Sequence, residues 1–229
     1  MGYQLISAHL VALQEASPII LETGWPDSGS LMLSVIIPTH ESERSLVRTL
    51  SCLVSGATGG LIREVILADA GSHDETAGVG DVAGCKLIVL PGSSGARLKA
   101  AATVARSSWL FFLLPGTVLD NGWVNEAIRF IETAEATQAA VFRRAARPVA
   151  QSSTLGEIGA LIRSGFHYPK PEQGLIVSRQ HYNSLGGHDA NAARPESDLL
   201  KRLGRNRIVR LRSGAIMMAP LERAAPTAR

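Results

Sequence analysis

The sequence has little of what marks secreted, disulfide-stabilised or nucleic-acid-binding proteins. Its 229 residues include only two cysteines, Cys52 and Cys85, and neither has a C-x-x-C or histidine spacing around it. We expect buried free thiols in a reducing compartment, because a disulfide framework or metal site needs more ligands at closer spacing. Aromatic residues make up only 5% of the chain, and no stacking motif interleaves with the arginines. This composition argues against a nucleic-acid partner.

Long apolar runs and a leader pattern are also missing. The longest apolar run, Trp109 to Leu114, is far too short to span a bilayer. The N-terminus lacks the basic start and small-residue cleavage pattern of a signal peptide. These absences predict a cytoplasmic protein.

Charge is unevenly distributed along the chain. The formal net charge is +3 and the sequence pI is near 9.1. Basic residues gather toward the C-terminus: Lys201, Arg202, Arg205, Arg207, Arg210 and Arg212. Such a stretch suits phosphate-bearing ligands or a peripheral contact with an anionic membrane surface, although a solvated helix face is its commoner meaning.

The length and a hydrophobic content of 45% are enough for one α/β domain with a sizeable core. Residues 1–31 stand apart, because a cluster of turn-forming residues at 24–29 separates them from the first strong strand pattern. We therefore expect a dispensable N-terminal extension at 1–31, a single domain at 32–219 and a flexible tail at 220–229.

Strand and helix patterns alternate from residue 32 to about 144. Strands are expected at 33–37, 64–68, 86–90, 109–114 and 139–142. An amphipathic helix is expected after the first strand and an alanine-rich helix after the third. Asn121 is expected to cap the helix that runs to about Ala136. Further on, we expect helices at 154–163 and 197–203 and strands near 174–178 and 208–211. The alternation predicts a Rossmann-like, mostly parallel sheet with helices on both faces and ligands at the carboxyl ends of its strands.

Short polar motifs follow the predicted strands. S-V-I-I-P-T occupies 34–39, D-x-G-S-x-D-x-T occupies 69–76, and a P-G-S-S-G turn at 91–95 opens an alanine-rich helix. In this order the motifs resemble family 2 glycosyltransferases of the A-type fold, over most of residues 32–212. The resemblance implies a single A-type domain that binds a nucleoside-diphosphate sugar and transfers the sugar, with inversion, to an acceptor that the sequence does not identify.

The resemblance also implies a nucleotide pocket. Its expected residues are Pro38, Thr39, Glu41, Asp69, Gly71, Ser72, Asp74, Arg97 and Lys99. Asp69 is the strongest candidate, and the motif favours this role over the alternative that Asp69 caps a turn with the residues that follow it. The glycine- and serine-rich turn at 92–95 is either an anion-binding helix start beside Arg97 and Lys99 or an ordinary strand-to-helix turn.

Inverting transfer needs a base that deprotonates the acceptor hydroxyl. Glu196 and Asp198 resemble the family's acidic pair before an Arg-rich helix, with Glu196 in the position of the base. Acidic residues also favour helix N-termini for dipole reasons alone, so capping is the competing role for both. Glu172 and Gln173, with the glycine after them, resemble the family's D-Q-G and are expected on the acceptor side.

A divalent metal, Mn²⁺ or Mg²⁺, is usual in the family, but its ligands are missing here. When the 109–117 segment is aligned on the D-x-D motif, the two aspartate positions hold Leu114 and Gly116. Neither side chain offers the oxygen ligands that these ions require, and Asp120 is expected to turn into the next helix. We therefore predict no metal site, with Arg97 or Lys99 as alternative sources of positive charge.

Two other functions stay open at this stage. The first is a catalytically degenerate nucleotide-sugar-binding or interaction module without transferase activity, which the apolar residue at 114 favours. The second is an unrelated nucleotide-binding α/β enzyme such as a nucleotidyltransferase, which the specific D-x-G-S-x-D-x-T block argues against.

Overall fold

The computed structural model of the protein describes residues 32–145 and 168–218. In chain order the elements are β1 (Leu33–Thr39), α2 (Glu43–Thr58), β2 (Ile62–Asp69), α3 (Thr76–Val82), β3 (Lys86–Val89), α4 (Ser94–Val104), β4 (Trp109–Phe112), β5 (Thr117–Leu119), α5 (Trp123–Thr133), β6 (Ala139–Arg144), η1 (Pro171–Gln173), β7 (Leu175–Ser178), α7 (Arg179–Ser184), α8 (Pro195–Leu203), η2 (Arg205–Arg207) and β8 (Ile208–Met217). Strands and helices alternate through the first half of the chain, as predicted.

The strands form one mixed sheet in the order β3-β2-β1-β4-β7-β6-β8-β5. Its first half is parallel, because β1 pairs in parallel with both β2 and β4, and β2 pairs in parallel with β3. The second half is mixed: β7 is antiparallel to β4 and β6, β8 is parallel to β6, and β5 is antiparallel to β8. The predicted Rossmann-like arrangement is confirmed.

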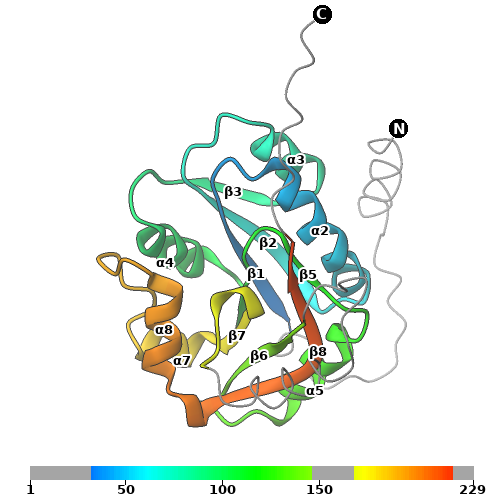
Figure 1. The fold of residues 1–229 in the computed structure, drawn as a ribbon, viewed down its shortest axis with the longest axis vertical. Helices are drawn as coiled ribbons and strands as arrows, with labels where there is room; N and C mark the ends of the chain where they lie inside the picture. The colour runs from blue at the N-terminus through cyan, green and yellow to red at the C-terminus, as the bar shows by residue number, and fades with distance from the viewer. Residues whose placement is uncertain (1–31, 146–167, 219–229) are drawn as a thin grey trace, which may run out of the picture.

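Helices cover both faces of the sheet, and each face has its own apolar cluster (Figure 1). Val35 and Ile37 of β1 pack toward α2 and α5, whereas Ile36 packs toward α4 and α8. Successive side chains of a strand point to opposite faces, so a fully apolar β1 is what a strand buried on both sides requires. The two layers hold the strand ends rigidly at one edge.

Several boundaries differ from the predicted ones. α5 begins at Trp123 with Gly122 as its N-cap, so Asn121 is not the cap residue. The sequence analysis missed β5, and it gave β8 only four of its ten residues. The proposed extension at 1–31, the helix at 154–163 and the tail at 220–229 lie outside the described residues.

Both cysteines are free thiols, as predicted. Each is partly buried against the α2 face of the core. Burial raises the pKa of Cys52 to about 11 and that of Cys85 to about 12, so both stay protonated at neutral pH. They act as small apolar residues.

Candidate functional site

The carboxyl ends of β1, β2 and β3 lie side by side at one edge of the sheet. Thr39 is in register with Asp69, and Asp69 is in register with Val89. After β3 the Leu90 amide donates to the Asp69 carbonyl at 3.0 Å, and the chain then continues into the Gly92 turn. This hydrogen bond keeps the start of that turn next to Asp69. Parallel pairing therefore collects Thr39, Asp69 and the Gly92 turn at one edge, as the motif spacing predicted.

Asp69 is the centre of this edge and is only 3% exposed. Its Oδ1 accepts from the hydroxyls of Thr39 and Ser72, both at 2.7 Å. Its Oδ2 accepts from the amides of Gly71 and Ser72 at 2.8 and 2.7 Å. Burial alone would raise the pKa of this carboxyl, but the bonds from Ser72, Thr39 and Gly71 outweigh burial and lower it. The turn-capping role is thus present in the structure.

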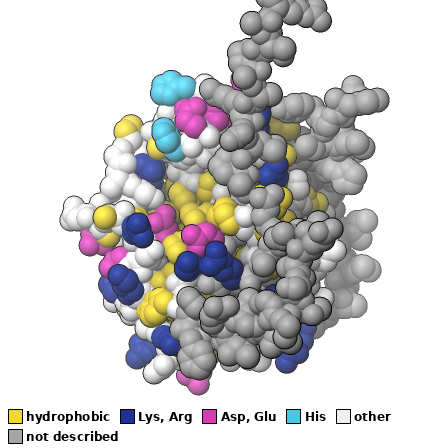
Figure 2. Space-filling view, viewed as in Figure 1, with side chains coloured by type: hydrophobic (Ala, Val, Ile, Leu, Met, Phe, Trp, Pro, Cys, Tyr) yellow, Lys and Arg dark blue, Asp and Glu magenta, His cyan; other side chains and the backbone are white. Residues whose placement is uncertain are grey.

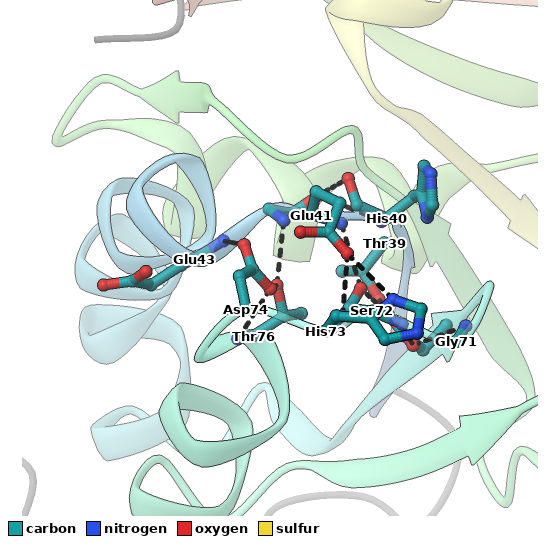
Figure 3. A network of polar contacts seen from close by, with 11 residues as sticks. Thr39, His40, Glu41, Glu43, Gly71, Ser72, His73, Asp74 and Thr76 are labelled. Carbon is teal, nitrogen blue, oxygen red and sulfur yellow. Dashed lines mark hydrogen bonds and ion pairs between the residues drawn. The ribbon is translucent and has the colours of Figure 1, made fainter. Parts of the chain in front are cut away.

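The loop after β1 is fastened to the loop after β2 by side chains from both (Figure 3). The Glu41 amide donates to Ser72 Oγ at 2.9 Å, and Glu41 Oε1 accepts from the His73 amide at 2.7 Å. Glu41 has a φ of 49°, a left-handed conformation that non-glycine residues seldom adopt. These contacts fix the exposed Glu41 side chain at the rim of the edge.

A second set of contacts anchors the start of α2. Asp74 Oδ2 accepts from the Glu43 amide at 3.1 Å, and Asp74 Oδ1 accepts from the Thr76 amide at 3.0 Å and from the Thr76 hydroxyl (Figure 3). The Thr76 hydroxyl in turn accepts from the Ser42 amide at 2.8 Å. The D-x-G-S-x-D-x-T block therefore builds a rigid double loop, with both acidic residues engaged inside it.

Arg97 lies in the first turn of α4 and is only 8% exposed. Its Nη1 donates to the Gly92 carbonyl at 2.5 Å, while its Nε is buried and has no hydrogen-bond partner among the described residues. No ion pair joins it to a carboxylate within the described parts of the chain. A buried cation without a counter-ion is costly, so an anion at the start of α4 would be favourable. Lys99 is exposed on the same helix.

A mainly apolar pocket lies beside this edge, where β1 and β4 end. Its polar side chains are Lys170, His188 and Glu196. The apolar or small residues lining it are Pro38, Leu98, Phe112, Leu113, Leu114, Pro171, Gly174, Leu175 and Leu200. Hydrophobic side chains also gather in the middle of this face of the molecule, with acidic and basic ones next to them (Figure 2).

The structure separates the two candidate acids of α8. Glu196 lines the pocket, and its Oε1 accepts from the Ser94 hydroxyl at 3.3 Å, which joins α8 to the start of α4. Asp198 is not among the pocket residues. Its Oδ2 pairs with Arg202 at 2.7 Å, one turn further along the helix. Arg202 also donates to the carbonyls of Leu185 and Gly187, so Asp198 supports a structural clamp.

The predicted acceptor-side residues are close to the pocket but play different parts. Gln173 is buried, and its side chain donates to the Phe142 carbonyl at 2.6 Å and accepts from the Lys170 amide at 2.9 Å. These bonds hold η1 against β6. Glu172 is partly buried, and its Oε2 has no partner among the described residues. Both residues flank Lys170 and Gly174, which line the pocket.

The end of β4 does not fit a divalent cation. Leu114 turns an apolar side chain to the pocket. Gly116 is buried with a φ of 91°, and its amide donates to Thr49 Oγ1 at 2.8 Å and to the Ser45 carbonyl at 3.2 Å. Asp120 accepts from the amides of Gly122 and Gly214, as its expected turn toward the helix implied. Among residues 32–145 and 168–218 no three His, Cys, Asp or Glu side chains cluster as metal ligands.

The family model described as "Glycosyl transferase family 2" matches residues 34–200. The chain belongs to glycosyl transferase family 2. No curated protein sequence matches this family 2 chain. Solved structures that share this fold have low sequence identity to the chain.

The first structure is glucosyl-3-phosphoglycerate synthase from Mycobacterium tuberculosis in complex with Mn²⁺, UDP and glucosyl-3-phosphoglycerate. It has 19% identity and a TM-score of 0.60, with 87% of this chain and 78% of that chain covered. S. aureus TarS has 18% identity and a TM-score of 0.59, with 81% and 60% covered. Mannosyl-3-phosphoglycerate synthase from Rubrobacter xylanophilus has 14% identity and a TM-score of 0.57, with 96% and 71% covered. These values confirm the A-type fold.

The sequence analysis did not single out two polar residues of the pocket, Lys170 and His188. His188 is 1% exposed, and no catalytic or metal-binding spacing marks it in the sequence. The signal was weak, because its partners Phe112 and Tyr182 come together only in the folded chain.

The described residues also include no helix that is both long enough and apolar enough to cross a bilayer.

Proposed function

We propose that this family 2 protein is a glycosyltransferase that binds a nucleoside-diphosphate sugar at the β1–β2–β3 edge. The sugar passes, with inversion, to the hydroxyl of an acceptor held in the adjacent pocket. The observation that carries the proposal is the position of Glu196, which lines that pocket together with Pro38 of β1 and Leu114 after β4. A carboxylate is thus available at the border between the donor edge and the pocket.

The proposed reaction is a single displacement at the anomeric carbon. The acceptor oxygen forms a bond to that carbon while the bond from the carbon to the diphosphate oxygen breaks, and the diphosphate leaves with the electron pair. Glu196 receives the proton of the acceptor hydroxyl. The hydrogen bond from Ser94 orients its Oε1 and leaves the other carboxylate oxygen available for this transfer.

Stabilisation of the leaving diphosphate falls to fixed positive groups. Arg97 sits at the Gly92 turn, and the first amides of α4 lie beside it. Positive groups held in place before the reaction stabilise developing negative charge without reorganising. Lys99 adds a second, exposed cation on the same helix.

The surroundings of the donor edge support nucleotide binding. Thr39, Glu41, Asp69, Ser72 and Asp74 make a rigid, polar double loop at the carboxyl ends of parallel strands. Ligands of such sheets bind outside those strand ends. Several of the similar structures contain UDP or a UDP-sugar, which makes a uridine nucleotide the first donor to test.

A binding module without transferase activity is the second candidate. Two observations favour it: Leu114 and Gly116 leave the end of β4 without carboxylates, and both Asp69 oxygens are engaged in the protein's own turn. Such a module keeps the donor edge but transfers no sugar.

A peripheral membrane contact through the C-terminal basic stretch is a further part of the proposal. Lys201, Arg205, Arg207, Arg210 and Arg212 are exposed, whereas Arg202 is partly buried in its clamp. Exposed basic residues of this kind attract anionic surfaces.

The test is turnover of a panel of nucleotide sugars by the parent protein and by Glu196→Gln. We expect the parent to release nucleoside diphosphate from at least one donor. The turnover rate of the variant should be lower by about 100-fold or more, since a positioned base contributes at least that much to the rate. Donor affinity should be unchanged, because Glu196 meets the acceptor rather than the nucleotide. Glu132→Gln, an exposed change on α5, is the matched control. A parent that binds a donor but turns over none is the binding module.

A further inference from the structure

The pocket beside the donor edge is lined by a buried histidine, His188, that the proposed reaction does not use. His188 is 1% exposed, and its ring packs edge-on against Phe112, with the ring centroids 4.7 Å apart. Its Nε2 is buried and has no hydrogen-bond partner within the described residues. A buried polar group without a partner is unusual and points to a ligand that supplies one.

The contacts of His188 assign its tautomer. The Tyr182 hydroxyl already accepts a hydrogen bond from the His188 amide at 3.0 Å. The same hydroxyl lies 3.0 Å from Nδ1, and donation of its proton to Nδ1 satisfies both groups. Burial, with a smaller effect of Arg202, lowers the pKa of His188 to about 3, so the ring is neutral at physiological pH. Neutral imidazole accepting at Nδ1 carries its proton on Nε2, which is therefore a hydrogen-bond donor.

Apart from Lys170 and Glu196, the rest of the pocket lining offers no polar side chain to a strongly hydrated ligand. Leu98, Phe112, Leu114, Leu175 and Leu200 supply apolar walls. A sugar or phosphoglycerate bound here would lose hydration on several polar groups at once and recover few hydrogen bonds. An apolar body with one hydroxyl would bury its carbon atoms and keep a partner for its oxygen.

We propose that this pocket binds a hydroxyl group carried on an apolar body, and that the Nε2–H of His188 donates to the hydroxyl oxygen while Glu196 accepts its proton. The inference rests on the proposed function, because it names the class of acceptor: an apolar alcohol or phenol. His188 is then the residue that determines specificity for a hydroxyl.

Benzyl alcohol and toluene provide the test, since they share one apolar ring and differ by the hydroxyl group. Their affinities are measured by ligand-observed NMR titration of the full chain, in the parent and in His188→Phe. We expect benzyl alcohol to bind the parent at least about fivefold more tightly than toluene, the worth of one neutral hydrogen bond. In the variant the preference should disappear. Equal affinities in the parent, or no binding of either compound, overturn the proposal.

His181→Phe is the matched control. His181 is 4% exposed and also has a buried Nε2 with no partner among residues 32–145 and 168–218, but it lies on α7 outside the pocket lining. This variant should keep the full preference for benzyl alcohol. If it loses the preference to the same degree as His188→Phe, the effect is general and the assignment to His188 fails.

A spectroscopic measurement on the parent protein covers the case in which His188→Phe does not fold. The ¹⁵N resonance of His188 Nε2 should shift on addition of benzyl alcohol and stay in place with toluene; a resonance insensitive to both contradicts the proposal. A nucleotide-sugar titration runs beside it. If the alcohol binds and no nucleotide sugar does, the inference about the pocket holds and the proposed function is wrong. If a nucleotide sugar binds and the alcohol does not, the proposed function holds and the inference about the pocket is wrong.

Discussion

At the scale of single residues, the donor edge depends on how its carboxylates are engaged. Asp69 accepts four hydrogen bonds within the protein, and Asp74 ties the second loop to the start of α2. The D-x-G-S-x-D-x-T block, on which the proposed nucleotide site rests, is therefore also the element that holds these loops together. A change at Asp69 acts on stability before it acts on binding.

The first prediction at this scale concerns Asp69→Asn. The amide keeps the size of the carboxylate but loses its charge and one acceptor oxygen, so we expect the free energy of unfolding at pH 7 to fall by about 2 kcal/mol. Because the folded-state pKa of Asp69 is lowered, this stabilisation is present above the unfolded-state pKa of about 3.9 and is lost as the pH falls through the folded value. Urea unfolding of parent and variant between pH 7 and pH 3 measures it.

Glu135→Gln, an exposed carboxylate on the surface, serves as the control for that series. The gap between parent and Asp69→Asn should be widest at pH 7 and narrow toward pH 3. A variant as stable as the parent at pH 7 would show that the four hydrogen bonds contribute nothing, and the interpretation of the turn would be wrong.

The sequence predicted the residues of this edge better than it predicted their partners. Thr39, Asp69 and Ser72 could be grouped because the ends of neighbouring parallel strands meet at one edge. Whether Asp69 faces a ligand or its own turn depends on the loop geometry, which includes the positive φ of Glu41 and of Gly71. His188 could not be predicted, because its contacts with Phe112 and Tyr182 form only in the folded chain.

At the scale of elements, the end of β4 leads into a turn in which Leu114 and Gly116 carry no side-chain oxygen. The strand stops at Phe112, and the chain then makes a buried turn through Gly116 into the short strand β5. The Gly116 carbonyl accepts from the Met218 amide at 2.9 Å, which fastens the turn to the end of β8. The turn is thus part of the fold and leaves little room for a ligand-bearing side chain.

The second prediction compares carboxylates introduced at the two positions. Gly116→Asp forces a side chain onto a φ of 91°, with Met218 O only 3.2 Å from the new Cβ. We expect it to lose about 1 to 3 kcal/mol from backbone strain, in addition to any cost of burying charge. Leu114→Asp has no such strain, because Leu114 does not have a positive φ. In thermal unfolding, the melting temperature of Gly116→Asp should be well below that of Leu114→Asp.

Gly116→Ala isolates the backbone term, since it adds a Cβ without a charge. It should be destabilised relative to the parent, in the direction of Gly116→Asp. Equal melting temperatures for parent, Gly116→Ala and Gly116→Asp would mean that the turn tolerates a side chain. The backbone conformation of the turn would then not explain why residue 116 carries no metal ligand.

The elements themselves show where sequence patterns lose information. The parallel strands β1 to β4 could be predicted, because apolar runs that end in turn motifs alternate with helix patterns in this part of the chain. The antiparallel pairing of β7 with β4 could not, since an apolar run of four residues carries no signal of strand direction. β5 has only three residues, and its strand character comes from its pairing with β8.

At the scale of the whole molecule, the proposed donor edge and the proposed base come from different parts of the chain. The parallel half of the sheet supplies Thr39, Asp69 and Arg97, and α8, from the last third of the chain, supplies Glu196. The contact of Ser94 with Glu196 joins the two parts at the pocket. Only the folded domain therefore assembles the complete site.

The central claim of this account is that a nucleoside diphosphate binds at the β1–β2–β3 edge through Arg97 and needs no divalent metal. Calorimetric titration with UDP tests it directly, with EDTA or Mn²⁺, on the parent, Arg97→Ala and Lys86→Ala. Lys86, at the far end of β3, controls for the loss of one positive charge. We predict that UDP binds in EDTA and that Mn²⁺ changes its affinity little. The affinity should fall by about tenfold or more in Arg97→Ala and should be unchanged in Lys86→Ala. Binding that appears only with Mn²⁺, or that survives in Arg97→Ala, would contradict it.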